Sequence, residues 1–133
     1  MTQERPKLNI PLTQSARLLE VLAIVGLLAF WGLTIYFYPH LPETIPVHFN
    51  FKGEIDDYGH KKTLWILPII ATLLYALLTI FNRYPHMLNY PVQITTANAE
   101  RYYTKSTKLL RIIKLLVVIV FLLIEWIMIQ AAV

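Results

Sequence analysis

The chain has 133 residues, of which 56% are hydrophobic and 15% are charged, and its mean hydropathy is +0.52. Soluble domains are about 45–50% apolar and about 25% charged, so this composition disfavours a soluble globular protein. The absence of cysteine excludes disulfide scaffolds, thiolate metal sites and cysteine nucleophiles. The formal net charge of +4 acquires a meaning only from the positions of the cations.

Three apolar runs, at residues 18–38, 64–81 and 115–133, predict three transmembrane helices. A helix rises about 1.5 Å per residue, so each run is long enough to cross most or all of the roughly 30 Å hydrocarbon layer of a bilayer. We therefore predict an all-α membrane protein with a single membrane domain over residues 1–133. The lipid bilayer is the first partner that we expect.

The positions of the cations predict how these spans are oriented. Lysine and arginine gather in the N-terminal tail and in the connection at 82–114, whereas the three lysines of the connection at 39–63 are offset by four acids. Because cation-rich flanks stay in the cytoplasm, we expect a multi-pass protein of the inner membrane with a cytoplasmic N-terminus. Residues 39–63 then form an outer loop, and the C-terminus is extracytoplasmic.

The cytoplasmic connection at 82–114 contains a helical segment. From Thr96 onward the residues favour a helix, with Thr95 or Thr96 as its N-cap, and this helix extends the third span toward the cytoplasm. The remaining cations are expected to meet anionic lipid headgroups. Nucleic acid is excluded as a partner because the chain offers no soluble module with a basic, base-stacking groove.

The outer loop carries most of the chemical information. Val47–Phe51 alternates apolar and polar residues, which predicts a short strand with His48 and Asn50 on its polar face. Two turns are expected after it, at Gly53 and in the Asp-Asp-Tyr-Gly cluster that ends at Gly59. These turns bring Asp56 back toward His48 and Asn50, so we expect hydrogen bonds among the three side chains.

The loop also carries a motif of fixed letters at fixed spacing. It runs from Leu41-Pro42 through Ile45-Pro46-Val47-His48-Phe49-Asn50 to Gly53, Asp56, Gly59 and Lys61, and an early proline, Pro68, follows in the second span. This pattern resembles a family of bacterial membrane proteins known as domain of unknown function sixteen-forty-eight. The family includes the N-terminal part of SdpI-type immunity proteins, which protect bacteria from a secreted toxin. The resemblance implies a bacterial membrane location and an immunity-like role.

We interpret the chain as a non-enzymatic binding or regulatory component that uses its outer loop. The residues expected to bind a partner or to structure the loop are His48, Asn50, Gly53, Asp56, Gly59 and Lys61. The expected partner is a secreted peptide or another membrane protein, with no cofactor and no catalytic residue. Two alternatives stay open: a metal-dependent membrane enzyme that uses the loop His/Asp cluster, and a small transport or assembly subunit. In the former, the candidate ligands of a divalent metal are His40, His48, Asp56 and His60.

Two acidic residues interrupt the apolar runs. Glu125 lies in the third span, where an ionised carboxylate is costly, so it is either an ion- or proton-handling group or a structural carboxyl hydrogen-bonded to another helix. We favour the structural interpretation. Glu20 lies near the cytoplasmic end of the first span, where it can meet Arg17 or Lys114.

Overall fold

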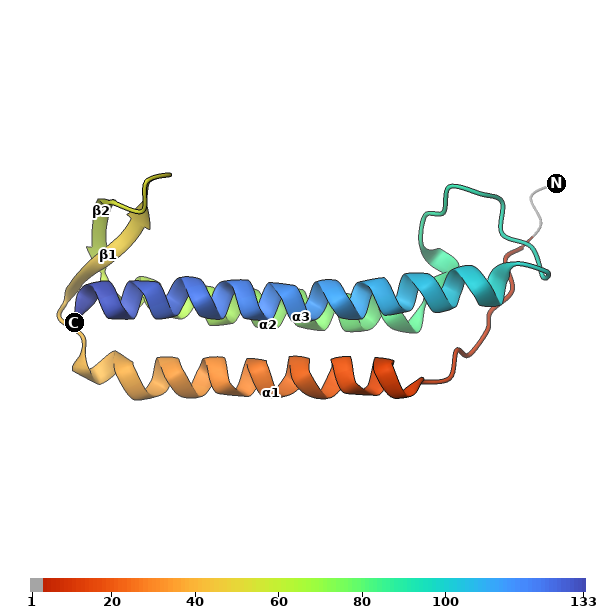
Figure 1. The fold of residues 1–133 in the computed structure, drawn as a ribbon, viewed down its shortest axis with the longest axis horizontal. Helices are drawn as coiled ribbons and strands as arrows, with labels where there is room; N and C mark the ends of the chain where they lie inside the picture. The colour runs from red at the N-terminus through yellow and green to blue at the C-terminus, as the bar shows by residue number, and fades with distance from the viewer. Residues whose placement is uncertain (1–3) are drawn as a thin grey trace.

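The computed structural model describes residues 4–133 and consists mainly of three long helices that lie side by side (Figure 1). They are α1 (Gln14–Phe37), α2 (Ile66–Arg83) and α3 (Ala99–Ala132). All three are long and apolar enough to cross a membrane. Short 3₁₀ turns at Tyr38–His40, Lys61–Trp65 and Pro85–Met87 adjoin the helix ends.

α3 packs against both α1 and α2. The centre of the bundle is a buried cluster of Leu27, Phe30, Ala71 and Val118, with α1, α2 and α3 all contributing. Gly26 lets α1 approach α3 closely, because a Cβ atom at this position would lie 3.0 Å from Val118 Cγ1. Small residues serve this purpose in membrane helices, where packing rather than a hydrophobic driving force holds the helices together.

α1 and α3 start earlier than their apolar runs alone predict, whereas α2 starts at Ile66, two residues after its run begins. Thr13 caps α1, accepting a hydrogen bond of 3.1 Å from the Ala16 backbone N–H, so the helix starts before residue 18. α3 is continuous from the connection into the third apolar run, as predicted, and its 34 residues cover about 51 Å. The predicted N-cap at Thr95 or Thr96 is wrong, because a turn in which Asn98 Oδ1 accepts from the Thr95 N–H at 2.7 Å delays the helix to Ala99.

The connection at residues 39–63 forms an antiparallel hairpin, so the fold is not all-α there, and the strand predicted at Val47–Phe51 overlaps its first strand. Its strands are β1 (Thr44–Phe49) and β2 (Ile55–His60). The second predicted turn is instead β2, because pairing with β1 overrides the turn preference of the Asp-Asp-Tyr-Gly sequence. Gly53 has a φ of +79° and makes the expected turn, whereas Gly59 is not in the left-handed region and lies against Val47, whose Cγ1 would be 3.1 Å from an added Cβ.

The hairpin and the C-terminus share one end of the bundle (Figure 1). A buried cluster fixes the base of the hairpin there: Leu41, Ile45, Leu64, Met128 and Ile129. Because two of these residues belong to α3, the last helix is the surface on which the apolar side of the loop packs.

At the opposite end of the bundle, two segments contact each other that the sequence analysis did not predict to be neighbours. The N-terminal tail lies beside residues 84–98 and the start of α3 (Figure 1). The Tyr103 hydroxyl donates to the Pro6 carbonyl at 2.9 Å, and the Arg5 guanidinium donates to the carbonyls of His86 and Leu88. Ile10, Ile94 and Tyr103 belong to the apolar cluster beneath these bonds.

Candidate functional site

The hairpin presents a small hollow surface away from its anchored base. The residues that line it are His48, Phe49, Asn50, Phe51 and Asp56, and the hollow has a volume of about 350 Å³. Phe51 is fully exposed at the tip of the hairpin. We call this set of five residues the hairpin surface.

The structure brings two predicted residues of the hairpin surface together. His48 Nδ1 lies 2.5 Å from Asp56 Oδ1, and the two side chains are 67% and 42% exposed. The carboxylate accepts from Nδ1–H, so the bond orients the imidazole and leaves Nε2 as the ring nitrogen outside this bond. Because both groups are solvated, the pair adds little to folding stability.

Asn50 has a different role from the one that its position next to His48 predicts. Its Oδ1 accepts from the backbone N–H groups of Lys52 and Glu54, each at 2.9 Å, and its Nδ2 donates to Glu54 Oε2 at 3.0 Å. Asn50 therefore closes the turn around Gly53 instead of joining the His48–Asp56 pair. This Asx-type turn is local, and it sets the position of Phe51 at the tip.

Lys61 connects the base of the hairpin to the end of α1. Its ammonium is within 3.4 Å of the Tyr38 carbonyl and 3.3 Å of the Leu41 carbonyl, and it lies 4.8 Å from the centre of the Tyr38 ring. Cations are favoured at such helix C-termini, where carbonyls lack intrahelical partners. Lys61 is thus a structural residue of the loop rather than a part of the hairpin surface.

The four candidate metal ligands do not come together. His40 Nδ1 contacts the Tyr36 carbonyl at 3.0 Å, and His60 Nε2 contacts Glu43 at 2.8 Å while its Nδ1 accepts from the Lys62 N–H. His48 and Asp56 form a separate pair. Within residues 4–133 no three His, Asp or Glu side chains are close enough together to coordinate one metal ion.

A polar layer between the helices lies toward the N-terminal end of α1. Glu20 of α1 accepts from Arg111 Nε at 2.9 Å and from Lys114 Nζ at 2.7 Å, both on α3. The Lys114 ammonium is fully buried and also donates to Thr79 Oγ1 of α2 at 3.1 Å. Of the two expected partners of Glu20, Lys114 is correct, whereas Arg17 gives way to Arg111. We call this set the charged layer.

A second polar layer lies nearer the hairpin. Glu125 is fully buried, about 10 Å of helix before the end of α3, and faces α1 instead of lipid. Thr34 Oγ1 lies 2.6 Å from Glu125 Oε2 and 3.0 Å from the Phe30 carbonyl, while Glu125 Oε1 is buried without a hydrogen-bond partner among residues 4–133. We call Thr34 and Glu125 the uncharged layer, because this pair includes no lysine or arginine. This carboxyl lies inside the bundle, which argues against a contact between subunits at Glu125.

Sequence reasoning missed the tip of the hairpin surface and the three-helix extent of the charged layer. The alternation at Val47–Phe51 predicts Phe51 on the apolar face of a strand. In the structure β1 ends at Phe49, so Phe51 lies in the turn around Gly53, at the tip of the hairpin. Lys114 and Thr79 lie 35 residues apart, so nothing local connects them. The one available signal was the presence of opposite charges, Glu20 and Lys114, at the ends of two apolar runs.

Comparison with known proteins identifies the family of the loop region. Residues 25–72, which comprise the second half of α1, the hairpin and the start of α2, match the model of the family described as Domain of unknown function (DUF1648). This segment belongs to that family, and the prediction made from the loop motif is confirmed. The resemblance to SdpI-type immunity proteins stays a prediction.

One relative extends beyond this segment. An Archaeoglobus fulgidus protein that bears the name "Uncharacterized protein" is 34% identical over 89 residues, which cover 61% of this chain and 49% of the relative. The chain thus spans about half the length of this relative. No solved structure matches the chain.

Proposed function

We propose that this protein is a multi-pass membrane component that acts by binding, and that the hairpin surface recognises a secreted peptide or another membrane protein. The observation that carries the proposal is the contrast within the hairpin. Its base is fixed by the Leu41–Ile129 cluster and by Lys61, whereas Phe51 at its tip is fully exposed. A rigid base lowers the entropy cost of binding, because the surface is already in its bound shape.

The composition of the hairpin surface suits recognition. Exposed aromatic side chains serve as anchors at protein interfaces, and polar groups around them select the partner. Phe51 supplies the aromatic group, and the His48–Asp56 pair supplies a fixed imidazole nitrogen together with a carboxylate. A partner with an apolar residue next to a hydrogen-bond donor or a cation matches this arrangement.

The position of the hairpin relative to α3 favours a partner at the membrane surface. A second hollow, of about 270 Å³, lies between Phe49 and Gly53 of the hairpin and Ile124 and Ile127 of α3. The hairpin therefore extends beside α3 (Figure 1), next to its exposed apolar residues Ile124 and Ile127. An amphipathic secreted peptide or the helix of a membrane protein reaches this position more readily than a soluble protein does. The resemblance to immunity proteins supports a secreted peptide.

The orientation forms part of the proposal. We infer that the hairpin and C-terminus face outward from a cell membrane and that the N-terminus is cytoplasmic, because the cations gather at the opposite end. A reporter fused after Lys62 is expected to be accessible from outside, and one fused after Arg83 is not. Access at Arg83 from outside the cell would invert the orientation.

A photo-crosslinking amino acid at position 51 tests the binding role in cells. We expect a discrete protein or peptide adduct from position 51. The control position is Tyr36, an aromatic residue near the end of α1 that is 65% exposed, and we expect it to give lipid adducts only. Asp56→Asn is expected to reduce the adduct severalfold without lowering the amount of protein in the membrane. Lipid adducts alone from both positions would contradict the proposal.

A further inference from the structure

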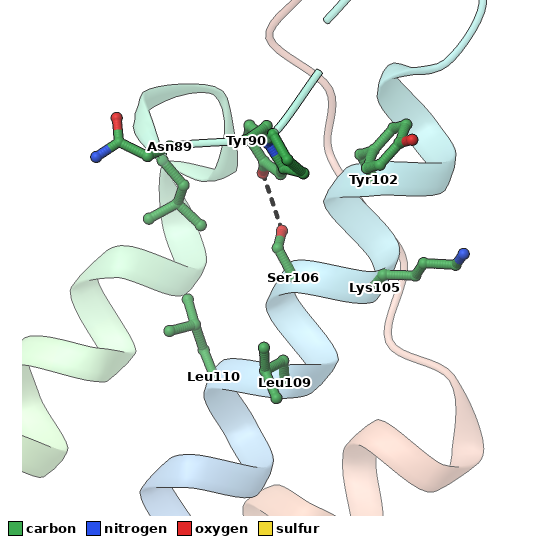
Figure 2. Close-up of a pocket in the computed structure, with 9 residues that line it drawn as sticks. Asn89, Tyr90, Tyr102, Lys105, Ser106, Leu109 and Leu110 are labelled. Atoms are coloured by element: carbon green, nitrogen blue, oxygen red, sulfur yellow. Dashed lines mark hydrogen bonds between the residues drawn. The ribbon is translucent and has the colours of Figure 1, made fainter. Parts of the chain in front are cut away.

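A pocket lies at the end of the bundle opposite to the hairpin, between residues 88–91 and the N-terminal part of α3 (Figure 2). Its volume is about 430 Å³. The residues that line it are Leu88, Asn89, Tyr90, Pro91, Tyr102, Lys105, Ser106, Leu109 and Leu110. We call it the end pocket.

The interior of the end pocket is suited to hydrocarbon. Leu88, Leu109 and Leu110 form much of its wall. The Tyr90 hydroxyl, one of the polar groups that line the pocket, donates to the Pro85 carbonyl at 2.6 Å and lies 2.9 Å from Ser106 Oγ (Figure 2). With this hydroxyl already bonded, a polar ligand deep in the pocket gains few new hydrogen bonds.

The rim of the end pocket is polar and positively charged. Lys105 is exposed on α3 with its ammonium pointing outward, and Asn89 lies across the opening (Figure 2). Residues 82–110 carry four cations, Arg83, Arg101, Lys105 and Lys108, and a single acid, Glu100. This charge balance complements an anionic headgroup at a membrane surface.

The pocket is continuous with the surface of α3 that faces lipid. Leu109, Ile113 and Leu116 follow one another at helical spacing and are 56%, 37% and 52% exposed. A second hollow, of about 460 Å³, adjoins the pocket at Leu88 and Asn89 and is otherwise lined by Ile80, Phe81, Tyr84 and Met87. Two apolar paths therefore leave one polar rim, as the two acyl chains of a phospholipid leave its headgroup.

We propose that the end pocket binds an anionic phospholipid from the leaflet at this end of the bundle. The headgroup phosphate pairs with Lys105, the glycerol lies in the pocket, and one acyl chain follows Leu109 and Ile113 along α3. The second chain occupies the adjoining hollow beside Phe81. Such a lipid joins α2, residues 84–91 and α3 at the end of the bundle where few buried residues connect them. This role is independent of what the hairpin surface binds.

Native mass spectrometry of the purified protein in a neutral detergent tests the proposal. We expect phosphatidylglycerol to bind more tightly than phosphatidylcholine with the same acyl chains. Lys105→Ala is expected to weaken phosphatidylglycerol binding about fivefold. Phosphatidylcholine binding is expected to fall less, because the choline cation of that lipid already offsets the charge of its phosphate. The matched control is Lys108→Ala, which removes the same charge one turn further along α3, where the side chain lines a different hollow with Thr104 and Thr107.

Two results would overturn the lipid site. Equal affinity for the two lipids would contradict recognition of the anionic headgroup. Equal losses of phosphatidylglycerol affinity in the Lys105→Ala and Lys108→Ala variants would indicate diffuse electrostatic attraction instead of a specific site. A second variant, Leu109→Trp, fills the mouth of the pocket and changes a residue that is 56% exposed, so it leaves the buried core intact. This variant is expected to lower the affinity for both lipids severalfold. Unchanged binding would contradict the proposed path of the acyl chain.

Discussion

Glu20 and Glu125 both lie between helices, but their surroundings differ in kind. Glu20 faces two cationic side chains of α3, Arg111 and Lys114, and the two ion pairs join α1 to α3. Glu125 faces one hydroxyl, that of Thr34, and its second oxygen has no hydrogen-bond partner. An ionised carboxylate with so little compensation is costly inside a membrane.

The uncharged layer has one hydroxyl proton for two acceptors. The Thr34 hydroxyl has one proton but is within bonding distance of two acceptors, the Phe30 carbonyl and Glu125 Oε2. If Glu125 carries a proton on Oε2, the carboxyl donates to Thr34 and Thr34 donates to Phe30, and both contacts are hydrogen bonds. The two layers thus join α1 to α3 by different contacts, the charged layer by ion pairs and the uncharged layer by the hydrogen bond between Thr34 and Glu125.

The largest expected effect comes from removing the acid of the charged layer. Glu20→Gln leaves the buried Lys114 ammonium without a full counter-charge, and we expect the free energy of unfolding in detergent to fall by about 3 kcal/mol or more. Lys114→Met is expected to cost less, since Glu20 then keeps Arg111. Equal losses for the two variants would show that Arg111 does not compensate Glu20.

A threonine-to-valine substitution in each layer compares how much stability each threonine hydroxyl contributes. Thr34→Val keeps the shape of the side chain and removes the one hydrogen-bond partner that the Glu125 side chain has among the described residues, so we expect a loss of about 2 kcal/mol in the free energy of unfolding. Denaturant titration in detergent measures it. A loss below about 0.5 kcal/mol would indicate that Glu125 finds another partner.

Thr79→Val is the matched change in the charged layer. Lys114 loses a bond of 3.1 Å but keeps the stronger bond to Glu20 at 2.7 Å. We therefore expect a loss of about 1 kcal/mol, smaller than that of Thr34→Val in the same titration. The reverse order would mean that the charged layer depends on α2 more than on the Glu20–Lys114 pair.

The smallest expected effect is that of Glu125→Gln. A neutral amide replaces a carboxyl that we infer to be neutral, so unfolding free energy should change by less than about 1 kcal/mol. In the same variant the crosslink from position 51 to a partner is expected to persist. A folded variant that loses the partner would instead assign Glu125 an ion- or proton-handling role, and a large loss of stability would indicate that the native carboxyl is charged.

Sequence patterns were informative where the determinant was local or periodic. The three spans follow from apolar length, because nearly every residue between their ends is compatible with lipid. The turn at Gly53 and the contact between His48 and Asp56 follow from short-range spacing, and the structure contains both. The family followed from the fixed letters of the loop.

The remaining features depend on which distant segments meet. Residues 56–59 have the composition of a turn, and only pairing with β1 makes them a strand, which in turn moves Phe51 from a buried face to an exposed tip. The sequence alone determined that three apolar helices and a structured loop exist, because hydropathy and turn chemistry are properties of short segments. The tertiary structure alone decided that Glu20 meets two cations while Glu125 meets one hydroxyl, because those contacts join residues 91 or more positions apart.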